Sequence, residues 1–434
     1  MIDYNKLFDD LYPINRSILG EGYRKSLIIL SKFIKFKVYK VKSGEMAFDW
    51  TVPKEWKINS AYLEDESGKK IIEFKNNNLS VVNYSSPVNK FINLNKLQEN
   101  LFSIPKQPNH IPYITSYYKK NWGFCIKEKE RKKLKPGKYH AVINSSFVDG
   151  HLEFGVKKIP GKTNKDFLIS SYLCHPSMAN NELSGPLVMV GLYNNIVKYK
   201  KRKFNYIFLI NPETIGSICF LKKFGKKLKK NLVGGLVLTC LGGPKNKLSY
   251  KKSRSGNSSL DKLFLHLSKK NKCYVREFDP TEGSDERQFC SSGFNLPVGQ
   301  AARTIYGQYK EYHTSGDDKK FMNINKISAS VEFLTKVILL NEKCSPLIRK
   351  EPYCELQLGK RGLYPNMNTP KSIKDRYVHM KENNKKQLSQ KIMMYILSYA
   401  DGNHDIIDVA NMLNLDIEDV AKIYDSLISR NILI

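Results

Sequence analysis

The chain has 434 residues, 41% of them hydrophobic, and its 72 basic against 41 acidic residues give a formal charge of +31. This length predicts two or three domains, and this apolar content excludes an intrinsically disordered chain because it is enough to bury a core. No apolar run reaches the ~18 residues of a membrane helix, and the first residues lack the basic and apolar regions of a secretion signal. We therefore expect a cytoplasmic protein with no membrane partner.

The cysteines and the excess of lysine both have simple explanations. The 8 cysteines are scattered and none forms a CxxC pair, which predicts reduced thiols in the core rather than a disulfide framework. The densest basic runs, at 198–204 and 222–230, each follow an amphipathic segment. We interpret them as solvated helix ends rather than as a surface for nucleic acid.

The N-terminal part of the chain predicts two kinds of structure. Residues 1–35 have the pattern of one or two helices, and a strand pattern follows over 36–44. From residue 48 to about residue 147, short β-rich pieces alternate with turns that contain Asn, Pro and Gly. This change from helical to β-rich sequence patterns predicts a small inserted β domain.

Beyond the insertion, strand-like runs alternate with helical ones. The pairs are 166–173 with 185–199, 204–210 with 215–224, 234–241 with 258–270, and 296–302 with 326–342. Runs that are apolar on both faces, each followed by a helix, predict an α/β domain whose mixed, mainly parallel sheet is covered by helices. In such sheets the functional residues lie just beyond the carboxyl ends of the strands.

The C-terminal segment has a helical pattern that differs from the two preceding regions. After 359–370, three short helical patterns separated by turns predict a winged-helix or helix-turn-helix outline. Residues 387–434 contain seven acidic residues (Asp401, Asp405, Asp408, Asp416, Glu418, Asp419 and Asp425) and three basic ones (Lys391, Lys422 and Arg430). This acidic balance would repel phosphate, so it argues against nucleic acid as a partner and favours a packing or protein-contact module.

Side chains that bind metals follow several of the predicted strands. They are His175, Asn181 and Glu182 after the first strand, Glu213 after the second, and Asp285, Glu286 and His313 in later segments. Imidazole and carboxylate groups are the ligands that a catalytic Zn²⁺ takes, with one position left for water. Zinc makes such a water nucleophilic near neutral pH, and a nearby carboxylate can accept its proton.

Each of these residues also has a plain structural interpretation. A histidine after a strand often caps a turn, Glu213 could complement a helix N-terminus, and Asp285 could be an N-cap. The recurrence of the same chemistry at successive strand ends favours a functional site. Cys174 beside His175 could indicate a thiol nucleophile, but adjacent strand residues point to opposite faces of a sheet. We therefore prefer a metal site.

The segments around these residues resemble the zinc aminopeptidases, which have the glutaminyl cyclases among their relatives. The matching stretches are "CHPS" (174–177), "NNELSG" (180–185), "PETIGS" (212–217), "GSDERQF" (283–289) and "YHTSGDD" (312–318). More narrowly, "LYPINRSI" (11–18), "FDWTVPKEW" (48–56) and the winged-helix outline resemble a bacterial family of aminopeptidase-like proteins. The resemblance covers nearly the whole chain and implies a zinc-exopeptidase-like fold.

The resemblance also implies the domain boundaries. We expect a discontinuous α/β domain (1–47 and 148–345), an inserted β domain resembling a protease-associated domain (48–147), and a winged-helix-like domain (346–434). The insertion would border the cleft and shape access to it.

The sequence departs from the family motifs at three acidic positions. Asn181 stands where the family has a metal-bridging Asp, Pro212 replaces the first Glu of a Glu-Glu pair, and Thr239 stands where the family has an Asp at the end of a strand. Two zinc ions need more negative charge than these residues leave. The resemblance therefore implies one Zn²⁺ as the cofactor.

The roles of the remaining residues follow from the same resemblance. The expected metal ligands are His175, His313 and either Glu213 or the side-chain carbonyl of Asn181. The expected catalytic residues, which act as the base or orient the ligands, are Glu182, Glu213 and Asp285, with Glu286 as an alternative. Arg303 and Tyr306 are expected to hold a carboxylate or phosphate of the substrate.

We expect a zinc-dependent, aminopeptidase-like hydrolase that cleaves an amide-type bond with one metal ion. The resemblance associates relatives with surface-polysaccharide biosynthesis, so the expected substrate is a peptide or an aminoacylated or N-acylated sugar. The lost acidic residues motivate a second hypothesis, a catalytically degenerate binding protein on the same scaffold. A third hypothesis, a nucleic-acid-associated regulator, rests on the +31 charge and the helix-turn-helix outline. The sequence leaves open whether the chain forms a homo-oligomer.

Overall fold

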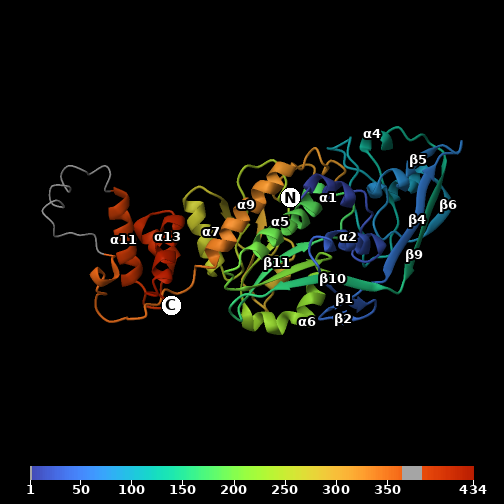
Figure 1. The fold of residues 1–434 in the computed structure, drawn as a ribbon. Coiled ribbons are helices and arrows are strands. Elements are labelled where there is room, and N and C mark those ends of the chain that lie inside the picture. The colour runs from blue at the N-terminus through green and yellow to red at the C-terminus, as the bar shows by residue number, and fades with distance from the viewer. Residues whose placement is uncertain (1, 364–383) are drawn as a thin grey trace. The chain divides into compact units, whose positions relative to one another are not determined.

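The computed structural model describes residues 2–363 and 384–434 (Figure 1). The chain divides into two compact units, one made of residues 1–261 and 272–335 and the other of residues 262–271 and 336–434. Among the helices in the described residues, none is both long and apolar enough to cross a membrane.

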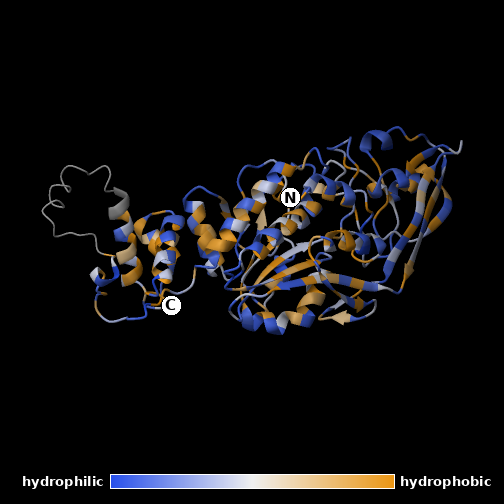
Figure 2. Ribbon diagram, viewed as in Figure 1, coloured by the Kyte–Doolittle hydropathy of each residue, from blue (hydrophilic) through white to orange (hydrophobic). Residues whose placement is uncertain are grey.

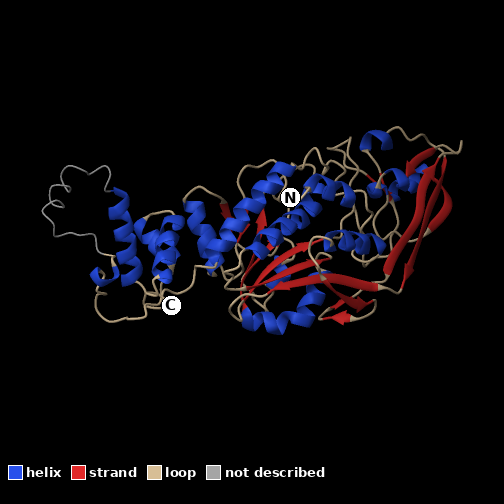
Figure 3. Cartoon of the chain, viewed as in Figure 1, coloured by secondary structure: helices blue, strands red, loops and turns tan. Residues whose placement is uncertain are grey.

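The first unit is built on an eight-stranded sheet with the strand order β1-β10-β12-β11-β13-β16-β14-β15 (Figure 3). Its strands are β1 (Lys37–Lys42), β10 (His151–Ile159), β11 (Asp166–Tyr172), β12 (Asn205–Asn211), β13 (Leu232–Leu238), β14 (Ser249–Lys251), β15 (Tyr274–Arg276) and β16 (Val298–Ala302). β11 pairs in parallel with β12 and β13, and β13 pairs in parallel with β16. β10 runs antiparallel to β1 and β12, and β14 antiparallel to β16. The predicted mixed, mainly parallel sheet is confirmed.

Helices cover this sheet and bury its central strands. The helices are α1 (Tyr4–Leu11), α2 (Glu21–Ser31), α5 (Ser184–Lys198), α6 (Ile215–Asn231), α8 (Glu286–Phe289) and α9 (Ile324–Asn341), whereas α7 (Ser259–Lys269) lies mostly in the second unit. Every residue of β11, β12 and β16 is buried, because α5 lies on one side of the sheet and α6 on the other (Figure 1). Figure 2 shows the same distribution, with apolar residues concentrated in the central strands and the helix faces toward them.

A second, smaller sheet lies in the β-rich insertion. Its antiparallel strands are β5 (Lys70–Glu73), β4 (Glu55–Glu64), β9 (Lys138–Val148) and β6 (Val88–Asn93), in that order. Short elements accompany it: β2 (Met46–Ala47), β3 (Trp50–Thr51), β7 (Leu101–Phe102), β8 (Phe124–Cys125), α3 (Leu94–Leu97) and α4 (Glu128–Arg131). Apolar side chains such as Leu63, Ile72 and Phe124 form its core. β9 leads directly into β10, so the smaller sheet is joined to the central sheet by consecutive strands.

The second unit contains the three helices predicted near the C-terminus. They are α11 (Asn384–Ser398), α12 (Ile406–Leu413) and α13 (Ile417–Ser429). Asp405 begins α12 by accepting hydrogen bonds from the backbone N–H groups of Ile407 and Asp408, and the Asp408 carboxylate accepts one from the Asp405 N–H in return. Ile396, Val409 and Val420 are among the buried residues of these helices.

Candidate active site

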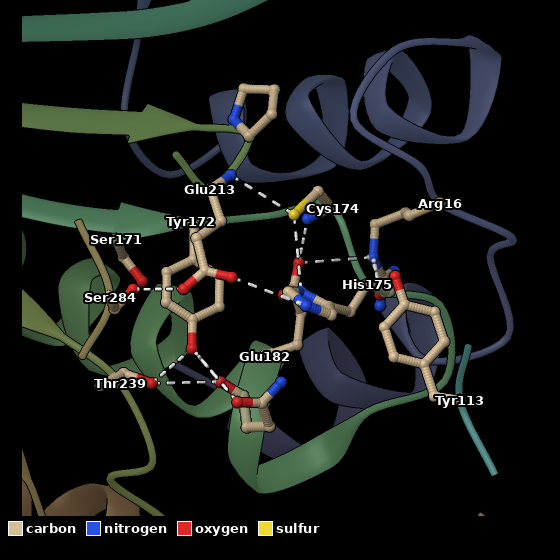
Figure 4. A network of polar contacts seen from close by, with 12 residues as sticks. Arg16, Tyr113, Ser171, Tyr172, Cys174, His175, Glu182, Glu213, Thr239 and Ser284 are labelled. Carbon is tan, nitrogen blue, oxygen red and sulfur yellow. Dashed lines mark hydrogen bonds and ion pairs between the residues drawn. The ribbon is translucent and has the colours of Figure 1, made fainter. Parts of the chain in front are cut away.

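Three residues that the sequence singled out lie at the carboxyl ends of neighbouring strands (Figure 4). His175 follows β11, Glu213 follows β12, and Thr239 follows β13. These three strands run parallel to one another, so their carboxyl ends meet at one edge of the sheet.

His175 is held in one orientation by its buried neighbours. Its Nδ1 lies 2.6 Å from Oε2 of Glu182, and Glu182 also accepts the backbone N–H of Cys174. The Nε of Arg16 donates to the carbonyl of His175 at 3.0 Å and lies 4.0 Å from Oε1 of Glu182. Arg16 and Glu182 are both buried. A carboxylate that holds one ring nitrogen of a histidine leaves the other available as a ligand, as in many metal sites.

Glu213 lies opposite the other nitrogen of that ring. Its Oε2 is 3.7 Å from Nε2 of His175, and its Oε1 accepts a hydrogen bond of 2.5 Å from Oγ of Ser284. Burial raises the pKa of Glu213, although His175 and Ser284 act in the opposite direction. The two oxygens of this carboxylate therefore have separate partners, one for positioning and one facing the imidazole.

His313 brings a second imidazole to the same place. The ring centroids of His175 and His313 lie 5.4 Å apart, and Tyr113 contacts both rings. Nε2 of His313 is buried and has no hydrogen-bond partner among the residues that the structure describes. Burial, together with the neighbouring His175, lowers the pKa of His313 to about 3, so this imidazole is neutral and keeps a lone pair at physiological pH. A buried polar atom without a partner is costly, which fits a nitrogen that binds a metal.

The described residues include one group of three whose ligand atoms lie within 4.8 Å of one another, namely Cys174, His175 and Glu182. We assign this group to orientation rather than to metal binding. The 2.6 Å between His175 and Glu182 is a hydrogen-bond distance, shorter than the ~3.3 Å that bond lengths of about 2.0–2.1 Å set between two donors on tetrahedral zinc. The 3.7 Å between Nε2 of His175 and Oε2 of Glu213 is close to that value. These two donors fit zinc, and His313, whose ring centroid lies 5.4 Å from that of His175, is a further imidazole beside them, although among the described residues its ligand atom does not lie within 4.8 Å of both.

A cluster of neutral groups lies beside this position. The hydroxyl of Tyr172 is 2.5 Å from Oγ1 of Thr239 and donates to the backbone oxygen and Oδ1 of Asn181 at 3.0 and 3.3 Å. Within the described part of the chain, Nδ2 of Asn181 has no hydrogen-bond partner. The structure thus joins Asn181 to Tyr172 and Thr239, and these three side chains offer no carboxylate to a second cation.

Asp285 and Glu286 lie behind the site. The carboxylate of Asp285 accepts hydrogen bonds from Nδ2 of Asn211, the backbone N–H of Thr214 and Oγ of Ser217. Burial, and next the charge of Glu213, raises the pKa of Asp285 to about 7. Thr214 has a φ of 64°, a strained value for a β-branched residue, so Asp285 fixes the turn that carries Glu213.

Glu286 is engaged in a buried ion pair. Its carboxylate lies 3.1 Å from Nζ of Lys251 and 3.0 Å from Nε2 of Gln300. Lys251 and Glu286 are both buried. This pairing anchors the loop that carries Ser284 rather than supplying a free base.

Arg303 and Tyr306 have their polar groups bound by the protein itself. Arg303 is 3% exposed, and its guanidinium donates to Oγ of Ser330 and the carbonyl of Lys245. The hydroxyl of Tyr306 donates to Oε1 of Gln300 at 3.2 Å. The structure does not bring either residue to His175 and Glu213.

A pocket of about 220 Å³ opens beside the two facing side chains. Its lining consists of Ile18, Trp50, Tyr117, Tyr118, Cys174, His175, Glu213, Thr214 and Ile215. Sequence reasoning missed Trp50, Tyr117 and Tyr118, as well as Ser284 and Tyr113. No local pattern identifies them, because their positions depend on contacts between segments far apart in the chain.

Comparison with known proteins assigns the chain to a family. Residues 5–343 match the family described as a domain of unknown function, DUF4910, and residues 346–434 match the winged helix-turn-helix family. The chain belongs to the DUF4910 family. A Clostridium acetobutylicum protein, described as a polysaccharide biosynthesis protein with an aminopeptidase-like domain, is 39% identical over 430 residues, which cover 98% of this chain and 94% of that protein. The DUF4910 chain is therefore a homologue of an aminopeptidase-like protein, and it carries a C-terminal winged helix.

Solved structures give the same fold. A crystal structure of a Clostridium acetobutylicum protein described as a peptidase has a TM-score of 0.87 and 37% identity, covering 99% of this chain and 95% of that one. A zinc aminopeptidase from Bacillus subtilis has a TM-score of 0.56 and 12% identity, covering 77% of this chain and 93% of that one. The predicted zinc-aminopeptidase-like fold is confirmed.

Proposed function

We propose that the protein is a mononuclear zinc hydrolase that cleaves an amide-type bond. The observation that carries the proposal is the facing pair of His175 Nε2 and Glu213 Oε2 at 3.7 Å, beside His313, whose Nε2 is buried and unpartnered. The likeness of the fold to zinc aminopeptidases supports the proposal.

His175, Glu213 and His313 would hold the zinc. When bound, zinc would supply Lewis acidity. This would polarise the carbonyl of the substrate and lower the pKa of a water so that the water can act as the nucleophile. Glu213 is the carboxylate nearest to His175 Nε2, and its Oε2 faces that nitrogen, which suits a zinc ligand.

The surrounding residues position these three. Glu182 and Arg16 hold the imidazole and backbone of His175, and Ser284 holds one oxygen of Glu213. We therefore propose an orienting role for Glu182, and for Asp285 we propose support of the turn that carries Glu213.

A single metal ion is supported by the neutral groups next to the site. The hydroxyl of Tyr172 joins the oxygens of Asn181 to the hydroxyl of Thr239 by hydrogen bonds, and these three side chains supply no negative charge. A second Zn²⁺ would need such charge to offset its loss of hydration. We therefore propose that Asn181 does not bind zinc and that its neutral amide disfavours a second cation beside the first.

The proposed substrate is a peptide or an aminoacylated or N-acylated sugar. The polysaccharide biosynthesis named for the Clostridium acetobutylicum relative motivates the sugar alternative. We also propose a cytoplasmic location, which is supported by the cysteines: Cys174 and Cys240 are among those that are free and buried in the structure.

Metal analysis of full-length protein purified without chelator tests the proposal. We expect about one zinc per chain, and at least about a 100-fold loss of zinc affinity in His175→Ala and His313→Ala. His404→Ala is the matched control, because His404 is bonded to Asp401 in the second unit and should leave zinc binding unchanged. Zinc-free protein, or equal zinc binding by all three variants, would leave the degenerate binding protein as the explanation.

A further inference from the structure

The size of the pocket beside His175 and Glu213 indicates how large a substrate group could bind there. Its volume of about 220 Å³ is below the roughly 300–1,000 Å³ of sites that enclose a whole drug-sized ligand. It therefore has room for one group of a larger substrate. Because His175 and Glu213 form part of its wall, that group lies next to the bond that the proposed hydrolase would cleave.

Three aromatic side chains from the insertion form much of the wall. Trp50 and Tyr118 contact edge to face, with ring centroids 5.6 Å apart. The hydroxyl of Tyr118 donates to the carbonyl of Thr51 at 3.3 Å, and the hydroxyl of Tyr117 is 2.9 Å from that of Tyr113. Since the protein itself binds both phenol groups, these residues offer the pocket mainly apolar ring surface.

The lining contains little that could recognise a charged or strongly polar group. It has no Lys, Arg or Asp, and its one carboxylate, Glu213, is held by Ser284 and faces His175. Ile18 and Ile215 complete the apolar wall. A sugar ring would bring several hydroxyl groups that need partners, and a charged side chain would lose its hydration without a counter-charge.

We propose that this pocket receives the neutral, apolar side chain of an aminoacyl group whose amide bond lies at His175 and Glu213. The inference rests on the proposed hydrolase activity and adds the class of side chain that the enzyme selects. A leucyl or phenylalanyl group fits the size and polarity of the pocket, and a lysyl or glutamyl group does not. The same chemistry applies whether the aminoacyl group is joined to a peptide or to an amino sugar.

Binding of a compound that cannot be hydrolysed tests the pocket separately from catalysis. L-Phenylalaninol and L-leucinol keep the amine and the side chain but have no amide bond. We expect both to bind the full-length protein, as measured by calorimetry, at least about 10-fold more tightly than L-lysinol or N-acetylglucosamine. Equal binding of all four compounds, or tighter binding of the last two, would overturn the proposal.

Substitutions in the pocket wall test whether the compounds bind in this pocket. Trp50→Ala and Tyr118→Ala should each weaken L-phenylalaninol binding by about 10-fold, because each removes an apolar wall. Phe91→Ala is the matched control, since Phe91 is 73% exposed on β6 and is not part of the lining. Equal losses in all three variants would contradict the assignment of the pocket.

A charge-introducing variant gives an independent positive result. Tyr118 is 56% exposed, so Tyr118→Glu should fold, and its carboxylate would supply the missing counter-charge. The preference should shift toward L-lysinol by at least about 10-fold. An unchanged preference would count against the pocket.

Hydrolysis separates the two proposals and the two kinds of substrate. Leucyl arylamide and N-leucyl glucosamine share the side chain and differ in the group released, so cleavage of one alone identifies the source. Selective L-leucinol binding without cleavage of either supports the pocket and overturns the hydrolase. Cleavage with no preference among leucyl, lysyl and glutamyl arylamides supports the hydrolase and overturns the pocket.

Discussion

The hydroxyl of Ser284 determines which way the carboxylate of Glu213 points. Its hydrogen bond of 2.5 Å occupies Oε1 and leaves Oε2 facing His175. Ser284 is itself buried, and its backbone N–H donates to Glu286. A group that does not touch the zinc would thus influence its affinity through one bond.

Replacing Ser284 tests this role. Ser284→Ala should lower zinc affinity by about 10- to 100-fold, while the loss of one hydrogen bond costs only about 1 kcal/mol of unfolding free energy. Chelator competition measures the first quantity and urea unfolding the second. Ser145→Ala is the control, because Ser145 is also buried and donates to a carbonyl, that of Ser85, in the insertion. Similar zinc affinities in both variants would show that Ser284 has no positioning role.

Single residues show where sequence reasoning works and where it does not. His175 and Glu213 could be predicted because each directly follows an apolar strand, and strand ends are read from local pattern. Ser284 could not, because its partner Glu213 lies in a different part of the chain. The substrate contact of Arg303 stays a prediction, and in the structure this side chain donates hydrogen bonds to Ser330 and to the carbonyl of Lys245.

At the scale of elements, the junction between β12 and α6 sets the position of Glu213. Asp285 bonds Thr214 and Ser217 at the start of α6, and burial is the main reason that the pKa of Asp285 rises to about 7. Between about pH 4 and pH 7 the folded protein keeps this proton, whereas the unfolded chain has lost it. The contribution of Asp285 to stability therefore falls as pH rises through this range, and it stays constant above about pH 7.

Asp285→Asn should remove this pH dependence. The free energy of unfolding of the wild type should fall relative to that of the variant by up to about 1.4 kcal/mol per pH unit between about pH 4 and pH 7. Urea unfolding at several pH values gives the two curves, and parallel curves would contradict the prediction. At about pH 4 the variant should be less stable in absolute terms, because an amide cannot accept all three hydrogen bonds.

Element prediction succeeded for long apolar patterns and missed short or irregular ones. β11 and β12 are runs of apolar residues before helices and could be read directly. The π-helical segment Ala179–Leu183 could not, because Asp317 stabilises it by accepting hydrogen bonds from the backbone N–H groups of Asn180 and Asn181 at 2.6 and 2.9 Å. Asp317 lies far from this segment in the sequence, so the local pattern of residues 179–183 could not indicate the contact.

At the scale of the whole molecule, the net charge of +31 and the winged helix both suggest a nucleic-acid partner, but they belong to different residues. Residues 387–434 contain seven acidic and three basic residues, and Glu418 and Asp419 occupy the first turn of α13. The exposed lysines of α6 lie in the first unit. We therefore propose that any affinity for nucleic acid is nonspecific and does not come from the winged helix.

Two sets of substitutions separate these sources of charge. Changing Lys226, Lys227 and Lys230 of α6 to Gln should weaken binding to duplex DNA and reduce the salt slope by about 1 for each phosphate that the protein no longer neutralises. Changing Lys391, Lys422 and Arg430 to Gln should leave both unchanged. Fluorescence anisotropy over a range of salt concentrations measures the affinity and the slope, and a larger effect of the second set would identify the winged helix as a DNA-binding module.

The aromatic part of the pocket wall and the two residues that face each other at the proposed zinc position come from separate stretches of the chain. Trp50, Tyr117 and Tyr118 lie in the insertion, whereas His175 and Glu213 follow strands of the central sheet. Evolution could therefore retune what the protein accepts by altering one stretch and leave the reactive machinery untouched. Replacing the insertion with that of a homologue should therefore transfer the substrate selectivity of the homologue.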